Sequence, residues 1–176
     1  MNLPKCLLLI PLFLVYACAQ KQLVQTQALP VGMAINEEAL LQAIAFGSCD
    51  RQDLDKPMWT YIHKDDRDLW IWLCDSINAD PDDMAALEAM YAQQKSKAGY
   101  QKLLNSCPVI GIWDDHDYGL NDGGKEFSKK SESKDLMLNF LDVQDTAAVR
   151  SSTGAYQSYT IGPAGKRVNI ILLDTR

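Results

Sequence analysis

The chain has 176 residues, of which 47% are apolar and 23% are charged, and its net charge at neutral pH is -6. This length and apolar share fit one folded domain with a real core, and they exclude a disordered or fibrous chain. The acidic balance comes without basic runs or interleaved basic and aromatic residues. It therefore excludes nucleic acid as a ligand and argues against adhesion to an anionic membrane surface.

The amino terminus is typical of an export signal. Lys5 precedes an apolar run over residues 6–16, which is too short to span a bilayer comfortably, and Ala17 and Cys18 follow it. The end of this run resembles the bacterial lipoprotein box, in which the cysteine is lipidated and becomes the first residue of the mature protein. An ordinary signal peptide cleaved nearby is the alternative interpretation.

Three segments follow from this interpretation. We expect a lipoprotein signal peptide over residues 1–18, a polar tether over 19–40 and a folded domain over 41–176. The protein is then an exported bacterial lipoprotein. Its lipid anchor at Cys18 holds it to a membrane, in the periplasm or at the cell surface.

Predicted strands and helices alternate along the folded part of the chain. Short apolar runs closed by turn residues predict strands, and apolar residues at helical spacing predict helices. The predicted strands cover 44–49, 68–75, 108–113, 155–161 and 167–173, and the predicted helices cover 58–64, about 80–97 and 133–141. This order predicts an α/β fold whose sheet is largely parallel at first. Strand 68–75 is apolar on both of its faces, so we expect helices to cover both sides.

Polar side chains follow several of these strands. In open α/β sheets, ligands bind outside the carboxyl ends of the strands. Crowded carboxylates repel one another, so a cluster there is favoured by a bound cation, and two cations can clamp the oxygens of a phosphoryl transfer. The alternative for the acidic run is a solvated turn. The residues at these ends are Cys49, Asp50, Asp75, Asp114, Asp115, His116, Asp117 and Asp174.

Three cysteines lie beyond the export signal and its anchor, namely Cys49, Cys74 and Cys107. An odd number outside the cytoplasm allows at most one disulfide and leaves a spare thiol. Cys49 and Cys74 each end a predicted strand and are expected at the same edge of the sheet, whereas Cys107 is expected to be a buried small hydrophobe. A thiol-redox protein is another class of protein that these cysteines allow. It is disfavoured because the sequence lacks the closely spaced cysteine pair of such proteins.

Four sequence blocks occur in a recognisable order between Phe46 and Arg176. They are Phe46-Gly47-Ser48-Cys49, Leu69-Trp70-Ile71-Trp72-Leu73, Trp113-Asp114-Asp115-His116-Asp117-Tyr118-Gly119 with Asn121-Asp122-Gly123-Gly124, and Ile171-Leu172-Leu173-Asp174-Thr175-Arg176. The blocks resemble the PhoD-like alkaline phosphatases of the calcineurin-like metallophosphoesterase superfamily. The resemblance implies the N-terminal half of an α-β-β-α sandwich with a mixed sheet. It also implies hydrolysis of phosphate mono- or diesters by metal-bound hydroxide, with Fe³⁺ and Ca²⁺ or another divalent pair.

The same resemblance implies roles for individual residues. Cys49 would be a thiolate ligand to a ferric ion, with an inert core thiol as the alternative. Asp75 would bridge two metals, and Asp115 would be a ligand at the second metal position within the catalytic group. His116 would donate a proton to the leaving alkoxide or stabilise the pentacoordinate phosphate, with a structural histidine that caps the turn as the alternative. Expected neighbours of the site are Asp50, Asn78, Asp114 and Asp117.

The chain departs from the family's Gly-Asp-Asn-Ile-Tyr stretch, which here is Cys74-Asp75-Ser76-Ile77-Asn78. Asn78 is a poor ligand for a hard trivalent cation, and Cys74 brings a second thiol near Cys49, which could bind metal or form a disulfide. The superfamily's other metal-binding histidines lie on later strands. We therefore interpret the chain as the N-terminal part of a metal-dependent phosphoric ester hydrolase. The alternative is a catalytically inactive, surface-anchored remnant that binds at most one cation.

Overall fold

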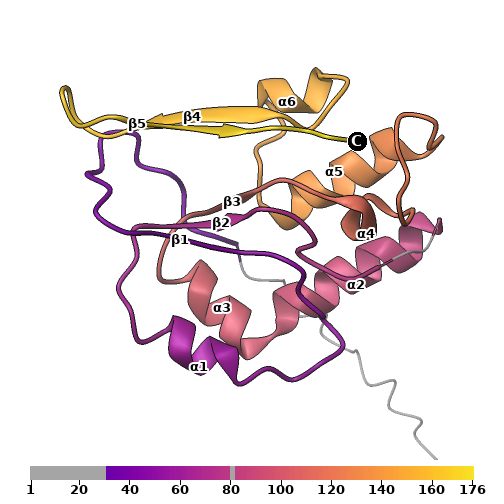
Figure 1. Ribbon diagram of the computed structural model, residues 1–176, viewed down its shortest axis with the longest axis horizontal. Coiled ribbons are helices and arrows are strands. Elements are labelled where there is room, and N and C mark those ends of the chain that lie inside the picture. Colours follow the sequence, from indigo (N-terminus) through magenta and orange to yellow (C-terminus); the bar gives the residue numbers. More distant parts are fainter. Residues whose placement is uncertain (1–30, 80–81) are drawn as a thin grey trace, which may run out of the picture.

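The computed structural model describes residues 31–79 and 82–176; the expected signal peptide, Cys18 and the first part of the tether lie outside these ranges. The described residues form a mixed α/β fold with two sheets (Figure 1). Among them, no helix combines the length and the apolar character needed to cross a membrane. The elements are β1 (Ile44–Gly47), α1 (Met58–Ile62), β2 (Leu69–Trp72), α2 (Met84–Ser96), α3 (Ala98–Leu104), β3 (Val109–Gly111), α4 (Asp115–Tyr118), α5 (Lys130–Phe140), α6 (Ala148–Ser151), β4 (Gln157–Ile161) and β5 (Val168–Leu172).

The first three strands form a parallel sheet in the order β1-β2-β3. Gly47 pairs with Trp72, and Trp72 pairs with Gly111, so the three strands end close to one another. All four residues of β2 are buried, which confirms that both faces of this strand are covered, although the sequence predicts helices on both sides. In Figure 1, α1 and α3 lie below this sheet and the β4-β5 pair lies above it.

Aromatic rings join the parallel sheet to its helices. Trp70 and Trp72 alternate with β2's other two residues and share the face toward α1 and α3. Their ring centroids are 5.4 Å apart with the planes nearly perpendicular, and Trp72 lies 6.0 Å from Tyr100 of α3. Tyr100 stacks on Phe140 of α5 at 5.3 Å. These contacts fix the position of the helices relative to β2.

The last two predicted strands form an antiparallel pair, which is a separate sheet among the described residues. Tyr159 pairs with Ile170 across it. Gly162 begins the connecting turn with a φ of 123°, a conformation that favours glycine. The inner face buries Ile161 and Leu172, whereas the outer face leaves Ile171 68% exposed. Within the strands the rest of this outer face is polar, because it carries Ser158, Thr160 and Asn169.

The sequence does not predict helix α3, because Gly99 is typical of a helix stop. Lys97 does end α2, as expected, but the chain starts a second helix at once. A side chain at Gly99 would lie 2.4 Å from Trp59 of α1. Gly99 therefore serves the packing of α1 on α3. Helices α4 and α6 are also absent from the prediction, because four residues show no helical period.

The described part of the expected tether makes contacts with the folded domain. The backbone N–H of Gly32 donates to Asp142 at 2.8 Å, and Met33 forms a parallel bridge with Pro108. The N–H of Gly162 donates to the carbonyl of Glu37 at 2.7 Å. Hydrogen bonds of the Gly32 N–H and of the Glu37 carbonyl thus tie this segment to the domain.

Candidate metal centre

The loops that follow β1, β2 and β3 converge at one edge of the parallel sheet. The hydrogen-bond ladder continues past the strand ends, because the N–H of Leu73 donates to Gly47 at 3.0 Å and the N–H of Ile112 donates to Trp72 at 3.0 Å. The N–H of Asp50 then donates to the carbonyl of Asp75 at 2.9 Å. The polar residues after the strands are therefore held by the sheet itself.

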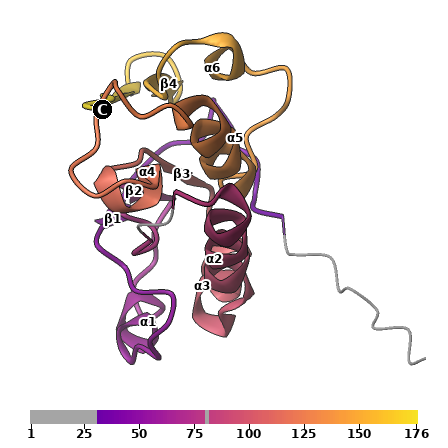
Figure 2. The same ribbon diagram turned by 90° about the vertical axis from the view of Figure 1, so that its right-hand side faces the viewer.

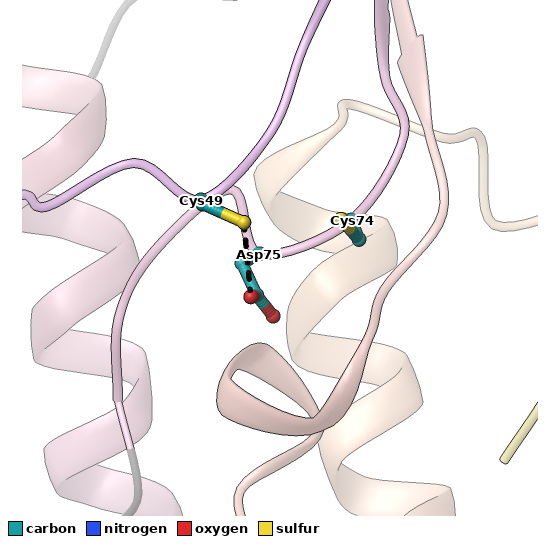
Figure 3. A group of neighbouring side chains, drawn as sticks. All are labelled: Cys49, Cys74 and Asp75. Carbon is teal, nitrogen blue, oxygen red and sulfur yellow. Dashed lines mark hydrogen bonds between the residues drawn. The ribbon is translucent and has the colours of Figure 1, made fainter.

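Two groups of side chains at this edge have ligand atoms close enough to hold a metal ion. One group is Cys49, Cys74 and Asp75, drawn in Figure 3, and the other is Asp75, Asp115 and His116. Within each group the ligand atoms all lie within 4.8 Å of one another. Asp75 belongs to both groups, and its two oxygens allow it to contact two cations at once. The short helix α4, which carries Asp115 and His116, lies beside the end of β2 in the turned view of the fold (Figure 2).

Asp75 carries a negative charge that the described side chains do not fully balance. The residue is 6% exposed, and its Oδ1 atom is buried without a hydrogen-bond partner among the described residues. Its Oδ2 atom accepts a weak hydrogen bond from the Cys49 thiol at 3.7 Å. Burial raises the pKa of Asp75, nearby His116 lowers it, and Asp115 and Asp114 raise it. A bound cation would supply the missing positive charge.

Asp115 and His116 begin the one-turn helix α4 directly after β3. The N–H of Asp122 donates to Asp115 Oδ2 at 3.0 Å and is the largest cause of a lowered pKa for Asp115. Asp115 therefore stays ionised and available as a hard oxygen ligand. His116 is half-buried beside both carboxylates, where it can hold a proton or a metal ion.

Both Cys49 and Asp75 have left-handed backbone conformations, with φ of 53° and 35°. This region is unfavourable for residues with a side chain, and such residues concentrate at functional sites. The turns bring the Cys49 thiol and the Asp75 carboxylate toward each other (Figure 3). Cys49 and Asp75 thus lie together at one edge of the sheet, as the order of the strands predicts.

Asp117, an expected neighbour of the site, is a structural residue. It is fully buried, and its carboxylate accepts hydrogen bonds from the N–H and hydroxyl of Ser76, both at 3.0 Å, and from the N–H of Asp114 at 2.7 Å. The hydroxyl of Tyr91 on α2 donates to the carbonyl of Asp117 at 3.1 Å. Burial outweighs these hydrogen bonds and raises the pKa of Asp117 to about 7.

The other expected neighbours also lie outside the two ligand groups. Asp50 is buried, pairs with Lys56 and accepts from Gln94 at 2.5 Å. The backbone of Asn78 exchanges two hydrogen bonds with the side chain of Gln52. The Asp50 carboxylate is therefore occupied by protein partners, and the backbone at Asn78 fastens the loop after β2 to the loop after β1.

Two more aspartates at strand ends have protein partners. Asp114 pairs with Arg176, whose Nε donates at 2.7 Å. Asp174 accepts from the indole of Trp113 at 2.8 Å and from the N–H of Ala155 at 2.7 Å, so it fastens β5 to the end of β3. These carboxylates are already satisfied by protein donors.

Several residues that shape the site carry no recognisable signal in the sequence. Ser76, Tyr91, Gln94 and Arg176 act through partners 26 to 62 positions away. The sequence predicts Tyr91 only as part of an apolar helix stripe. Arg176 does belong to the last of the four sequence blocks, but this position does not indicate that its partner is Asp114. Long-range polar pairs of this kind emerge only from the fold.

A solved structure described as "Structure of PhoD" is similar to this chain. The TM-score is 0.57 at 18% sequence identity, and the match covers 82% of this chain and 33% of that chain. The likeness therefore confirms the expected resemblance at the level of the fold, and this chain spans about a third of the length of that protein. No protein-family model matches the sequence, and no curated protein matches it.

The raised pKa of Asp117 predicts a pH-dependent loss of stability in the metal-free protein. The protonated Asp117 carboxyl makes its full contribution to stability below its ordinary pKa of 3.8. This contribution falls as the pH rises through the folded-state pKa of about 7, because the carboxyl ionises first in the unfolded chain. The amide of Asp117→Asn cannot ionise. The free energy of unfolding of the wild type, minus that of Asp117→Asn, should fall by about 4 kcal/mol across this range.

Urea titrations with a chelator at several pH values measure this difference. Asp145→Asn is the matched control, because the Asp145 side chain is 99% exposed. Its stability profile should run parallel to that of the wild type. Parallel profiles for Asp117→Asn as well would show that Asp117 ionises freely in the folded protein.

Proposed function

We propose that this chain forms the N-terminal part of a metal-dependent phosphoric ester hydrolase. The observation that carries the proposal is the pair of ligand groups that share the buried Asp75 at the carboxyl edge of the parallel sheet. The likeness in fold to the PhoD structure supports the same conclusion, and so does the order of the sequence blocks. A phosphate ester is the proposed substrate, and the complete domain is proposed to be an α-β-β-α sandwich.

The donor set fits a metal centre. Cys49 and Asp75 would hold one ion, and Asp75 with Asp115 would hold the other, as Fe³⁺ and a divalent ion such as Ca²⁺ or as another pair. The unpartnered Oδ1 of Asp75 is the atom that most needs a cation. When bound, the ions would act as Lewis acids that polarise the phosphoryl oxygens and activate a water molecule.

His116 is proposed as the proton donor. The ligand atoms of His116, Asp75 and Asp115 lie within 4.8 Å of one another, and both carboxylates favour the protonated imidazole. The protonated ring would transfer its proton to the leaving oxygen of the ester as the P–O bond breaks. The neutral ring would then recover a proton from the water consumed in hydrolysis.

Metal binding can be tested with Asp115→Asn. The wild type should retain a divalent or ferric ion after purification from metal-supplemented buffer, and the variant should bind it about 10- to 100-fold more weakly because one anionic ligand is lost. Elemental analysis and a competing chelator measure both properties. Asp145→Asn, which changes an exposed carboxylate, should behave as wild type. A metal-free wild type would support the solvated-turn alternative.

Hydrolysis tests the proposed activity. Among the described residues, His116 is the one histidine in a ligand group, and a two-metal site needs more ligands than this. We expect the 176-residue chain to hydrolyse p-nitrophenyl phosphate no faster than buffer and to self-associate through exposed Phe46, Ile171 and Leu173. Fusion to the remaining two thirds of a PhoD protein should restore chelator-sensitive turnover, more fully with Asn78→Tyr.

Site variants of the fusion protein separate this activity from a contaminant. His116→Ala should lower turnover by about 10²- to 10⁴-fold, and Asp75→Asn should remove it with the metal. A fusion that folds and binds metal but remains inactive would favour the inactive remnant. Rapid chelator-sensitive hydrolysis by the 176-residue chain would show that its own residues complete the site.

We also propose that the protein is an exported lipoprotein anchored through Cys18. The support is the sequence alone, because the apolar run 6–16 ends at Ala17-Cys18. Cells that express the full sequence should incorporate labelled palmitate, and Cys18→Ala should abolish the label. Cys6→Ala, within the apolar run, is the control and should keep it. Label retained in Cys18→Ala would exclude lipidation at this residue.

A further inference from the structure

We infer that Cys74 is a second thiolate ligand, so that Cys49, Cys74 and Asp75 form a site for a soft divalent ion such as Zn²⁺. This inference rests on the proposed metal centre and deepens it, because it names the class of ion at one of its two positions. It follows from where the sheet places the two thiols, from their distances to Asp75 and from the burial of that carboxylate.

The parallel register places the two cysteines opposite each other. Gly47 pairs with Trp72, and each cysteine follows two residues later. The ladder does not stop at the strand ends, since the N–H of Asp50 donates to the carbonyl of Asp75 at 2.9 Å. The loops that carry Cys49 and Cys74 are therefore joined by backbone hydrogen bonds on both sides of the cysteines, which fixes the relative positions of their backbones.

The distances suit a tetrahedral ion. Zinc with sulfur ligands at about 2.3 Å and an oxygen ligand at about 2.0 Å holds its ligand atoms roughly 3.5–3.8 Å apart. Cys49 Sγ lies 3.7 Å from Asp75 Oδ2, and Cys74 Sγ lies within 4.8 Å of the other two ligand atoms of its group. Small side-chain rotations would bring all three onto one ion. Cys49 is exposed, so a fourth position can take water.

Burial indicates that something binds here. Asp75 is only 6% exposed and its Oδ1 is unpartnered, whereas the neighbouring buried carboxylate of Asp117 accepts from three donors. The Cys49 thiol is a weak hydrogen-bond donor to Asp75 Oδ2, so it compensates little of the cost of burying this carboxylate. Two thiolates and one carboxylate select Zn²⁺ or Co²⁺ over Ca²⁺ or Fe³⁺, because soft sulfur ligands suit softer ions.

Cobalt spectroscopy of the full, reduced chain tests this inference without reference to activity. Co²⁺ bound by two thiolates should give strong near-ultraviolet sulfur-to-metal bands, and Cys74→Ser should lower their intensity to about half. Serine is nearly isosteric with cysteine, so the fold should be kept, as circular dichroism can verify. Zn²⁺ should displace Co²⁺, and its affinity should fall about 100-fold in Cys74→Ser.

Three further variants define the outcome. Cys49→Ser should behave like Cys74→Ser, and Cys107→Ser should leave the bands unchanged because Cys107 is buried outside both ligand groups. Asp115→Asn should also keep the thiolate bands. Equal bands in wild type and Cys74→Ser would overturn the inference, as would a Cys49–Cys74 disulfide that excludes the ion. Binding that depends on Asp115 and lacks thiolate bands would overturn it while leaving the proposed hydrolase centre intact.

Discussion

The buried carboxylate of Asp117 is the constraint on which the geometry of the candidate centre depends. It binds Ser76 in the loop after β2 and Asp114 in the loop after β3, and its carbonyl holds Tyr91 of α2. Water cannot replace these donors at a fully buried group, so each must stay in place or leave an unsatisfied polar atom. Asp75 precedes Ser76, and Asp115 follows Asp114. The separation of the two ligand-bearing loops is thus fixed by the hydrogen bonds of one side chain.

Two buried carboxylates at the same sheet edge have opposite functions. Asp117 accepts three hydrogen bonds, whereas Asp75 accepts a weak bond from a thiol at Oδ2 and leaves Oδ1 unpartnered among the described residues. Hydrogen bonds offset part of the free-energy cost of burying Asp117, whereas the cost of burying Asp75 stays uncompensated at Oδ1 until a cation binds. The consecutive acidic residues after β3 divide in the same way. Asp114 pairs with Arg176, and Asp115 remains available to a metal ion.

The sequence predicts the elements that have a clear period and the site positions that follow from strand polarity. Strand ends in a parallel sheet share an edge, so strand order alone is enough to place Cys49, Asp75 and Asp115 together. The structural roles of Asp50 and Asp117 are not predictable in this way, because they depend on Lys56, Gln94 and Ser76, which no local pattern connects to them. Helix α3 escapes prediction because Gly99 is required by contact with Trp59, which local propensity does not reveal.

The two ligand groups that meet at Asp75 differ in character. On the β1 side the donors are thiols at an exposed turn, held by a backbone ladder. On the β3 side Asp115 is oriented by the N–H of Asp122 and accompanied by His116. Soft and hard donors favour different ions, and one shared carboxylate couples their charges. An ion at the thiol position would neutralise part of the charge on Asp75 and so weaken binding at the second position. Binding at the two positions is therefore coupled, and an ion at either position lowers the affinity of the other by the same factor.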